Sequence, residues 1–323
     1  MTMHSFEQLL QQFETRFGIR HFPGQPSTLY DPAQYILGIG GKRVRPVMCI
    51  MGNELFDAIK PDAWEVATAI ELFHNFTLIH DDIMDQAPLR RGMDTVHHKY
   101  GVNTAILAGD AMMIMAWDYL RRINKDVMPE ILALFNQTAL EVSEGQQLDM
   151  DFEKRDKVSL DEYVNMITLK TSVLLAASLQ LGAVIGGAGE GNARHLYEFG
   201  KNLGVAFQVQ DDYLDAFGDP AKFGKQVGGD ILANKKTFLM IQALEAAPAA
   251  DKVLLQELME QNPADKVQQV LDIFQRAGVN EWALELKNRY IEKAMHHLDE
   301  IAVLSKRKEP LRQLADFLVQ REH

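Results

Sequence analysis

Apolar residues recur at spacings of three and four along most of the chain, which is the period of an amphipathic helix. The first such block contains Phe6, Leu9, Leu10, Phe13 and Phe17. No run of alternating apolar and polar residues bounded by turn signals stands out, and no glycine-rich turn joins a strand to a helix. The pattern predicts an all-α protein and disfavours an α/β nucleotide-binding fold.

Prolines lie mostly between the periodic blocks and divide the chain into roughly ten or more predicted helices. These helices are expected over residues 3–18, 43–58, 62–87, 102–122, 127–152, 159–186, 190–217, 234–246, 250–260, 264–277, 280–304 and 308–320. No linker rich in glycine, serine or proline interrupts the chain, and no repeat of fixed period stands out. We therefore expect residues 1–323 to form a single domain.

The composition excludes several classes of function. With 33 Lys and Arg against 45 Asp and Glu, the formal net charge is −12 and the pI is about 5.3, which disfavours nucleic acid as a partner. Any anionic ligand must therefore be bound by locally clustered cations. Cys49 is the only cysteine, which excludes an internal disulfide, a zinc cage of cysteines and a CxxC redox pair, and indicates a reducing compartment.

Two segments bear on where the protein resides. Residues 1–10 (MTMHSFEQLL) have neither the basic region nor the apolar region of a signal peptide. The most apolar stretch, residues 174–189, is interrupted by Gln180 and by glycines, and it falls short of the about 20 uninterrupted apolar residues of a membrane span. We expect a cytoplasmic protein without a membrane span.

Two acidic clusters share the pattern DDxxD, at residues 81–85 (DDIMD) and 211–215 (DDYLD). In a helix, the first and last aspartates of each cluster share one face about 6 Å apart, where like charges repel. Carboxylate oxygens at that spacing suit Mg²⁺, which binds through a few carboxylates and substrate phosphate oxygens. The predicted metal ligands are Asp81, Asp85, Asp211 and Asp215.

The surroundings of the two clusters argue against a solvated acidic face, which is the simplest alternative for a single cluster. Apolar residues precede the first cluster from Ile70 to Ile79 and the second from Leu203 to Val209. Carboxylates at the ends of such core helices indicate a cavity inside a helical bundle, where metal sites are built from facing helices.

Basic residues occur at three further places. Residues 40–46 (GGKRVRP) put a glycine turn before a basic helix start, which offers backbone donors and cations to an anion. Arg90 and Arg91 follow the first acidic cluster, and three lysines lie near apolar or glycine-rich segments, at Lys170, Lys225 and Lys235. Each alone is most simply a surface charge. Together with the aspartates they describe two anionic sites, one bound through metal and one directly by cations.

The motifs follow one another in the order GGKRVRP, FHNFTLIHDDIMDQAPLRRG, GQQLD, LKT, FQVQDDYLD and GKQVGGDILANKKT, over about residues 35–240. This order resembles the trans-type isoprenyl diphosphate synthases. The resemblance implies the isoprenoid synthase fold, a single-domain helical bundle around a central cavity. It also implies that the two aspartate-rich motifs bind three Mg²⁺ ions, which hold the diphosphate of an allylic substrate.

The resemblance further implies a reaction, the head-to-tail trans condensation of isopentenyl diphosphate with dimethylallyl, geranyl or farnesyl diphosphate by a short-chain prenyltransferase. Breaking the allylic C–O bond leaves a carbocation and a diphosphate, and the barrier falls when preplaced Mg²⁺, Arg and Lys hold the departing charge. An apolar helical cavity keeps the cation from water. This chemistry therefore agrees with the resemblance.

Residue roles follow from the same resemblance. Four residues match the positions that bind the diphosphate of isopentenyl diphosphate: Lys42, Arg45, His74 and Arg91. Four match those around the allylic diphosphate: Arg90, Lys170, Lys225 and Lys235. The expected catalytic residues are Lys170, Thr171, Gln208 and Arg90, while Gln146 and Asp149 match supporting polar positions near the metals.

Product length is expected to depend on the residues one and two turns before Asp81, because they lie about 5.4 and 11 Å deeper along the helix. Thr77, four residues before Asp81, is small, while Phe76 and Phe73 are aromatic. This pattern resembles that of geranylgeranyl diphosphate synthases. We expect a twenty-carbon product, with the fifteen-carbon farnesyl diphosphate as the alternative.

Two other functions remain open at this point. A class I terpene cyclase shares the helical bundle and a DDxxD motif, but its second metal motif usually mixes Asn, Ser and Glu, whereas residues 211–215 are again DDxxD. A noncatalytic regulatory subunit of a prenyl synthase typically lacks an aspartate motif, and this chain has both. The resemblance alone suggests a homodimer.

Overall fold

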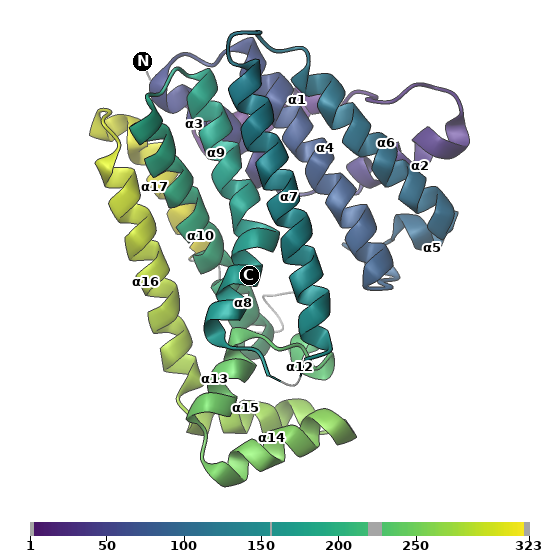
Figure 1. Cartoon of the computed structure of the whole chain (residues 1–323), viewed down its shortest axis with the longest axis vertical. Helices are drawn as coiled ribbons and strands as arrows, with labels where there is room; N and C mark the ends of the chain where they lie inside the picture. Colours follow the sequence, from purple (N-terminus) through teal and green to yellow (C-terminus); the bar gives the residue numbers. More distant parts are fainter. Residues whose placement is uncertain (1–2, 156, 219–227, 320–323) are drawn as a thin grey trace. The chain divides into compact units, whose positions relative to one another are not determined.

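The computed structural model describes residues 3–155, 157–218 and 228–319. Its elements are almost all helices, which confirms the predicted all-α fold (Figure 1). In chain order they are α1 (Phe6–Phe17), α2 (Ser27–Gly38), α3 (Val44–Phe56), α4 (Pro61–Met84), β1 (Leu89–Arg90), β2 (Met93–Asp94), α5 (Val96–Tyr100), α6 (Val102–Leu120), α7 (Met128–Glu153), α8 (Leu160–Ile167), η1 (Thr168–Ser172), α9 (Val173–Ile185), α10 (Glu190–Phe217), α12 (Gly229–Leu232), α13 (Phe238–Ala246), α14 (Ala249–Gln261), α15 (Lys266–Arg276), α16 (Val279–Glu300) and α17 (Ser305–Val319).

The chain divides into two compact units. Unit 1 comprises Met1–Phe135, Ser178–Ala193 and Val303–Pro310. Unit 2 comprises Asn136–Ala177, Arg194–Ala302 and Leu311–His323. The prediction that residues 1–323 form one domain stays a prediction.

Helix α2 was not predicted, because Pro26 and Pro32 interrupt the helical pattern there. A proline inside a helix removes a hydrogen bond and costs about 3 kcal/mol. In the structure Pro32 lies within α2 and is buried together with Ala33, Ile36 and Leu37. This apolar face packs against α6, and tertiary packing outweighs the local cost.

The predicted helix over residues 159–186 is confirmed in extent but contains a π-helical segment, η1, between α8 and α9. Among the described residues, the run Leu160–Ile185 is the one long and apolar enough to cross a membrane by length and composition. Within its most apolar stretch, 72% of the residues are buried inside the protein. This burial is typical of a core helix.

In unit 1, α4 and α6 run side by side (Figure 1). Gly109 on α6 permits their close approach, because a Cβ there would lie only 2.4 Å from Nε2 of His80 on α4. Deeper along α4, Phe73 is 2% exposed and its ring packs edge-on against Phe135, with 5.4 Å between centroids. An apolar and aromatic interior therefore fixes the C-terminal half of α4, which carries the first aspartate motif.

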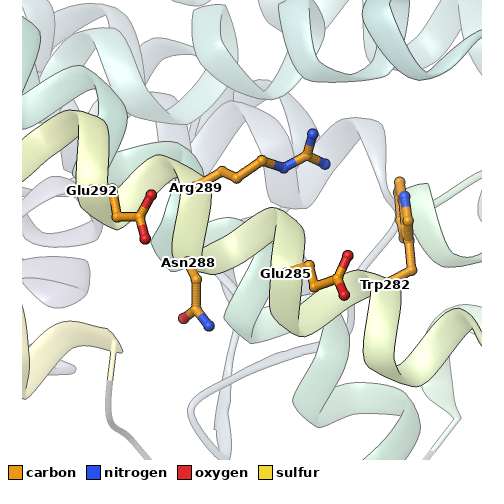
Figure 2. Close-up of a pocket in the computed structure, with 5 residues that line it drawn as sticks. All are labelled: Trp282, Glu285, Asn288, Arg289 and Glu292. Carbon is orange, nitrogen blue, oxygen red and sulfur yellow. The ribbon is translucent and has the colours of Figure 1, made fainter.

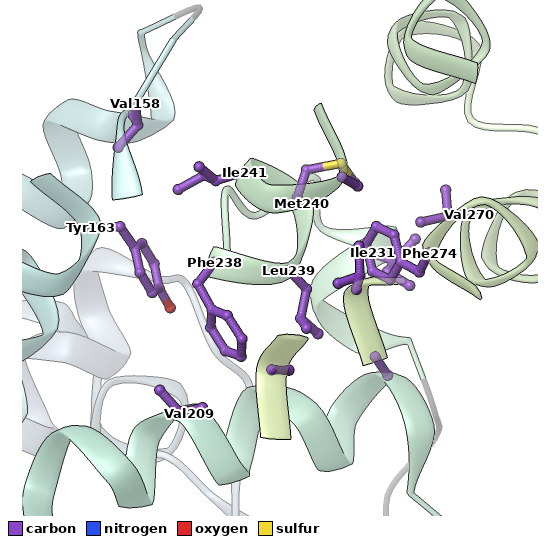
Figure 3. Packing of buried hydrophobic residues seen from close by; sticks show 14 of the residues in the cluster. Val158, Tyr163, Val209, Ile231, Phe238, Leu239, Met240, Ile241, Val270 and Phe274 are labelled. Carbon is purple, nitrogen blue, oxygen red and sulfur yellow. The ribbon is translucent and has the colours of Figure 1, made fainter. Parts of the chain in front are cut away.

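In unit 2, a core of buried apolar residues surrounds α13 (Figure 3). The ring of Phe238 lies near Tyr163 of α8 and Val209 of α10, while Leu239 faces Ile231 and Phe274. Because α8, α10, α12 and α15 all contribute to this core, it holds the end of α10, and with it the second aspartate motif, against the turn that precedes α13.

Candidate active site

The first aspartate motif forms the last turn of α4, with Asp85 as the C-cap. Asp82 is 2% exposed and accepts two hydrogen bonds from Arg90, from Nε at 2.9 Å and from Nη2 at 2.8 Å. Asp81 is partly exposed and Asp85 is exposed. The central aspartate therefore anchors Arg90 and the hairpin that carries it, while the outer two aspartates lie towards solvent.

The second motif, near the end of α10, repeats this division. Asp212 is buried and accepts hydrogen bonds from the Tyr163 hydroxyl at 2.6 Å and from Nε2 of Gln208 at 2.8 Å. Burial raises the pKa of Asp212 to about 7, against the opposing effect of the Tyr163 hydrogen bond. Asp211 and Asp215 are partly exposed. Here Gln208, a predicted catalytic residue, contacts the motif itself.

The outer aspartates fit a magnesium ion. Among the described residues, no group of three or more His, Cys, Asp or Glu side chains is placed to hold a metal by itself. Each motif instead offers two partly exposed or exposed carboxylates one turn apart. Mg²⁺ usually retains several waters and takes its remaining oxygens from one or two carboxylates and substrate phosphates. This arrangement agrees with the predicted Mg²⁺ ligands, which are Asp81, Asp85, Asp211 and Asp215. Their assignment to Mg²⁺ stays a prediction.

A cluster of basic side chains lies in unit 1, where the sequence predicted the isopentenyl diphosphate site. Nη1 of Arg45 lies 3.2 Å from Nε2 of His74. Nη1 of Arg91 donates to the Gly40 carbonyl, and a Cβ on Gly41 would lie 2.9 Å from the same nitrogen. The glycine turn therefore lets Arg91 approach the backbone before the exposed Lys42. Arg45, His74 and Arg91 therefore belong to one cluster, together with the turn that carries Lys42, the fourth residue predicted for this site.

Electrostatics in this cluster favour an anion. Burial, together with the positive charges of Arg45 and Arg91, holds the pKa of His74 well below its usual range. Burial lowers the pKa of Arg45 to about 10, although Glu71 opposes this shift. Nε of Arg45 is buried without a hydrogen-bond partner within the described part of the chain. An anionic ligand would offset the burial of these positive charges and their mutual repulsion, and it would offer an acceptor to Nε of Arg45.

Arg43, in the same basic segment, has a different role. It is 9% exposed, and its guanidinium donates to Glu71 and to the Leu37 carbonyl at 2.8 Å. Its backbone is left-handed, with a φ of 49°, at the N-cap of α3. Arg43 therefore links α2, α3 and α4. The sequence did not reveal this pairing, because Glu71 lies in an apolar stretch far from the basic segment.

In unit 2, Lys170 and Thr171 belong to η1. Nζ of Lys170 donates to Oδ2 of Asp149 on α7 at 2.5 Å. Two glycines permit close contact with η1: a Cβ on Gly145 would lie 2.2 Å from the Lys170 nitrogen, and one on Gly204 would lie 2.8 Å from Cα of Ser172. Single π turns occur frequently at functional sites. The sequence predicted the residues but not this backbone.

Replacing Gly145 by alanine is therefore expected to displace η1. The added methyl group meets backbone atoms that cannot rotate away, and overpacking of this kind typically costs about 1–3 kcal/mol. We expect a lower midpoint of urea unfolding and a lower turnover. Gly191→Ala is the matched control, because no atom lies within 4 Å of its added Cβ. Equal stability and turnover in the two variants would contradict the close packing of η1.

The predicted chain-length residues lie on α4, before Asp81. Phe73 is buried, while Phe76 and Thr77 are partly buried. Phe76 packs against Phe73 and His80, with ring centroids 5.8 and 4.8 Å apart. The Thr77 hydroxyl donates to the His74 carbonyl at 2.8 Å. Aromatic rings thus occupy the deeper turns, and the small side chain lies nearest the aspartates.

The remaining predicted cations lie beyond the second motif. Lys225 lies outside the described residues. Nζ of Lys235 lies 3.4 Å from Oδ1 of Asp230, whose backbone amide donates to Oδ2 of Asp215 at 3.0 Å. The neighbouring Lys236 donates to the Phe152 carbonyl at 2.8 Å and so caps the end of α7. Lys235 is thereby placed beside the second aspartate motif.

A separate hollow of about 450 Å³ lies on the surface of α16 (Figure 2). Its lining consists of α16 residues, namely Trp282, Glu285, Asn288, Arg289 and Glu292. None of the predicted site residues belongs to it. In each unit, the candidate site residues are therefore an aspartate motif and basic side chains, and not the lining of this hollow.

Comparisons with known proteins agree with this site. Residues 26–275 match the polyprenyl synthetase family. The short chain isoprenyl diphosphate synthase of Methanothermobacter thermautotrophicus is 38% identical over 92% of each chain, and the geranylgeranyl diphosphate synthase of Sulfolobus acidocaldarius is 36% identical over 93% of each chain. A crystal structure of a geranylgeranyl pyrophosphate synthase matches 99% of this chain and 100% of its own, with 44% identity and a TM-score of 0.94.

The helical fold and the paired aspartate motifs define an isoprenoid synthase. The chain belongs to the polyprenyl synthetase family. These matches confirm the family resemblance and the fold that the sequence predicted. They also confirm the predicted enzyme class, a short-chain trans-prenyltransferase.

Proposed function

We propose that this protein condenses isopentenyl diphosphate with an allylic diphosphate to form geranylgeranyl diphosphate, a twenty-carbon product. The proposed chain length rests on α4, where Thr77 lies next to the aspartate turn and the aromatic side chains of Phe76 and Phe73 lie deeper. Relatives named geranylgeranyl synthases support it at 36 and 44% identity. A fifteen-carbon product is the alternative.

The residues of unit 1 would bind isopentenyl diphosphate directly. Arg45, Arg91 and Lys42 supply positive charge without metal, and neutral His74 supplies a hydrogen-bonding ring nitrogen. The fork of an arginine suits paired phosphate oxygens. Because the basic groups are held by the glycine turn and by α4, they are oriented before the ligand arrives.

The allylic diphosphate would be bound at the aspartate motifs. Asp81, Asp85, Asp211 and Asp215 would hold Mg²⁺, whose charge stabilises the departing diphosphate. Arg90 pairs with Asp82 and Lys170 pairs with Asp149, and both would supply positive charge to this diphosphate. Thr171 and Gln208 would orient their dipoles towards the cationic carbons. The released diphosphate would take up the proton, since no side chain is an obvious base.

Replacing Arg45 by alanine is expected to raise the Michaelis constant for isopentenyl diphosphate about tenfold or more, with a much smaller effect on that for the allylic substrate. A lost ion contact acts on the ligand that it touches. Steady-state kinetics with each substrate varied in turn measures both constants. Arg20→Ala, at an exposed arginine paired with Asp31, is the control. Equal changes for both substrates would refute the separate binding sites.

The protein is also proposed to form a homodimer through α6. Four large apolar side chains on this helix are 40 to 67% exposed: Val102, Ile106, Leu107 and Ile114. Exposed apolar patches of this kind mark interaction sites. A second copy of the chain is the expected partner, because two copies of the same helix bury their apolar residues reciprocally.

Replacing Leu107 by glutamate is expected to convert the dimer to monomer, because a charge would be buried in the apolar contact. Analytical ultracentrifugation measures the mass in solution. The control is Leu304→Glu, at a residue that is 68% exposed and lies outside α6. A monomeric unaltered protein, or a Leu107→Glu dimer, would overturn the interface.

The reaction itself is tested with radiolabelled isopentenyl diphosphate, an allylic primer and Mg²⁺. A prenyltransferase incorporates label into a longer, acid-labile diphosphate. A terpene cyclase would consume the allylic primer without incorporating label, and a noncatalytic subunit would do neither. Either of these last two outcomes would overturn the proposed function.

A further inference from the structure

A lysine is buried at the start of α15, outside every predicted site motif. Lys266 is 0% exposed, and its ammonium donates to two side-chain amides, to Oδ1 of Asn262 at 2.9 Å and to Oδ1 of Asn234. Among the described residues, no carboxylate pairs with it. A buried ammonium held only by neutral groups is costly, and a cation is also disfavoured at the N-terminus of a helix.

Both amides lie at left-handed turns. Asn234 has a φ of 55° and Asn262 a φ of 50°. Asn234 also donates from Nδ2 to the Met259 carbonyl at 3.1 Å, which ties its turn to the end of α14. Lys266 therefore bridges the turn after α12 and the turn after α14. This bridge also explains why α13 begins at Phe238, four residues later than the sequence predicted.

The turn held by Lys266 leads directly to the second aspartate motif. The Lys235 amide donates to the Asp230 carbonyl at 2.9 Å, and the Asp230 amide donates to Oδ2 of Asp215 at 3.0 Å. The Gly228 amide donates to the Asp215 carbonyl at 2.7 Å. A Cβ on Gly228 would lie 2.5 Å from Cγ1 of Val267, next to Lys266 in the chain. Residues 228–235 are thus held between α15 and Asp215.

We propose that Lys266 is a positioning residue for the allylic diphosphate site, which it affects by fixing Asn234 and hence the orientation of Lys235 and the Asp215 carboxylate. This inference rests on the proposed function, since it assigns Lys235 and Asp215 to that substrate. Lys266 touches neither substrate nor metal. It acts through a chain of hydrogen bonds, Lys266 to Asn234 and then through the backbone of the turn to Asp215.

The test uses Lys266→Met, which keeps the length of the side chain and removes the ammonium. We expect the Michaelis constant for the allylic diphosphate to rise about tenfold, while that for isopentenyl diphosphate stays within about twofold. In the metal-free, substrate-free protein, backbone amides of residues 229–235 should exchange hydrogen faster. Lys252→Met is the control, because that lysine caps the Glu245 carbonyl on an exposed surface.

A second variant tests the proposal if Lys266→Met fails to fold. Asn234→Gly keeps the left-handed backbone and removes the side-chain amide, with its bonds to Lys266 and to the Met259 carbonyl, so it should give the same two changes. Unaltered protein that incorporates no label would overturn the proposed function. Active unaltered protein whose variants keep the allylic Michaelis constant, or keep the exchange rates, would overturn the role of Lys266.

Discussion

Replacing Asp81, Asp85 or Asp211 by alanine is expected to lower turnover by at least ~10²-fold, because each change removes a carboxylate that would hold the metal charge next to the departing diphosphate. The helical fold should persist, since these side chains lie on partly exposed or exposed helix faces. Steady-state turnover at saturating Mg²⁺ and circular dichroism together measure both effects.

The buried aspartates of the two motifs should behave differently from the outer ones. Asp82 and Asp212 are bound by Arg90 and Tyr163 within the protein, so their removal should lower the free energy of unfolding as well as turnover. Asp126→Ala, at an exposed aspartate between α6 and α7, is the control for loss of a surface charge. Turnover that survives the combined Asp81, Asp85 and Asp211 replacement would refute the metal assignment.

Replacing Thr77 by phenylalanine is expected to shorten the product by one prenyl unit, from twenty to fifteen carbons. The added ring fills about one helical turn of depth, roughly 5.4 Å, above Phe73. Reversed-phase chromatography of the dephosphorylated products measures the chain length. The reaction rate should fall less than in the aspartate variants, because Thr77 binds neither diphosphate.

Thr15→Phe is the matched control for this change. Thr15 is an exposed helical threonine whose hydroxyl also bonds a carbonyl in its own helix, that of Gln11 at 2.8 Å. An unchanged product in Thr77→Phe would show that the growing chain does not pass this face of α4, and the chain-length proposal would fail.

Helical periodicity predicted most of the fold because long amphipathic helices carry a strong signal. The predicted ranges 62–87 and 190–217 agree with α4 and α10 to within a few residues. The errors arose where long-range packing decides the structure. Helix α2 forms in spite of Pro32 because α6 covers it, and the hairpin of β1 and β2 is too short to show an alternating pattern.

The spacing of the aspartates predicted which carboxylates share a face, because that depends only on helix geometry. The partners of the central aspartates were not predictable in the same way. Tyr163 lies 49 residues from Asp212, and nothing in the spacing joins them. The same holds for the pairing of Arg43 with Glu71 and for Lys266, whose amide partners only the folded turns bring together.

The length of the product formed by the unaltered protein is the decisive measurement for the proposed function. Purified protein is incubated with dimethylallyl diphosphate, an excess of radiolabelled isopentenyl diphosphate and Mg²⁺, and the dephosphorylated products are separated by reversed-phase chromatography. Geranylgeraniol is expected as the main labelled product, and it should be lost on chelation of Mg²⁺. A product that stops at fifteen carbons, or chains well beyond twenty, would contradict the proposed function.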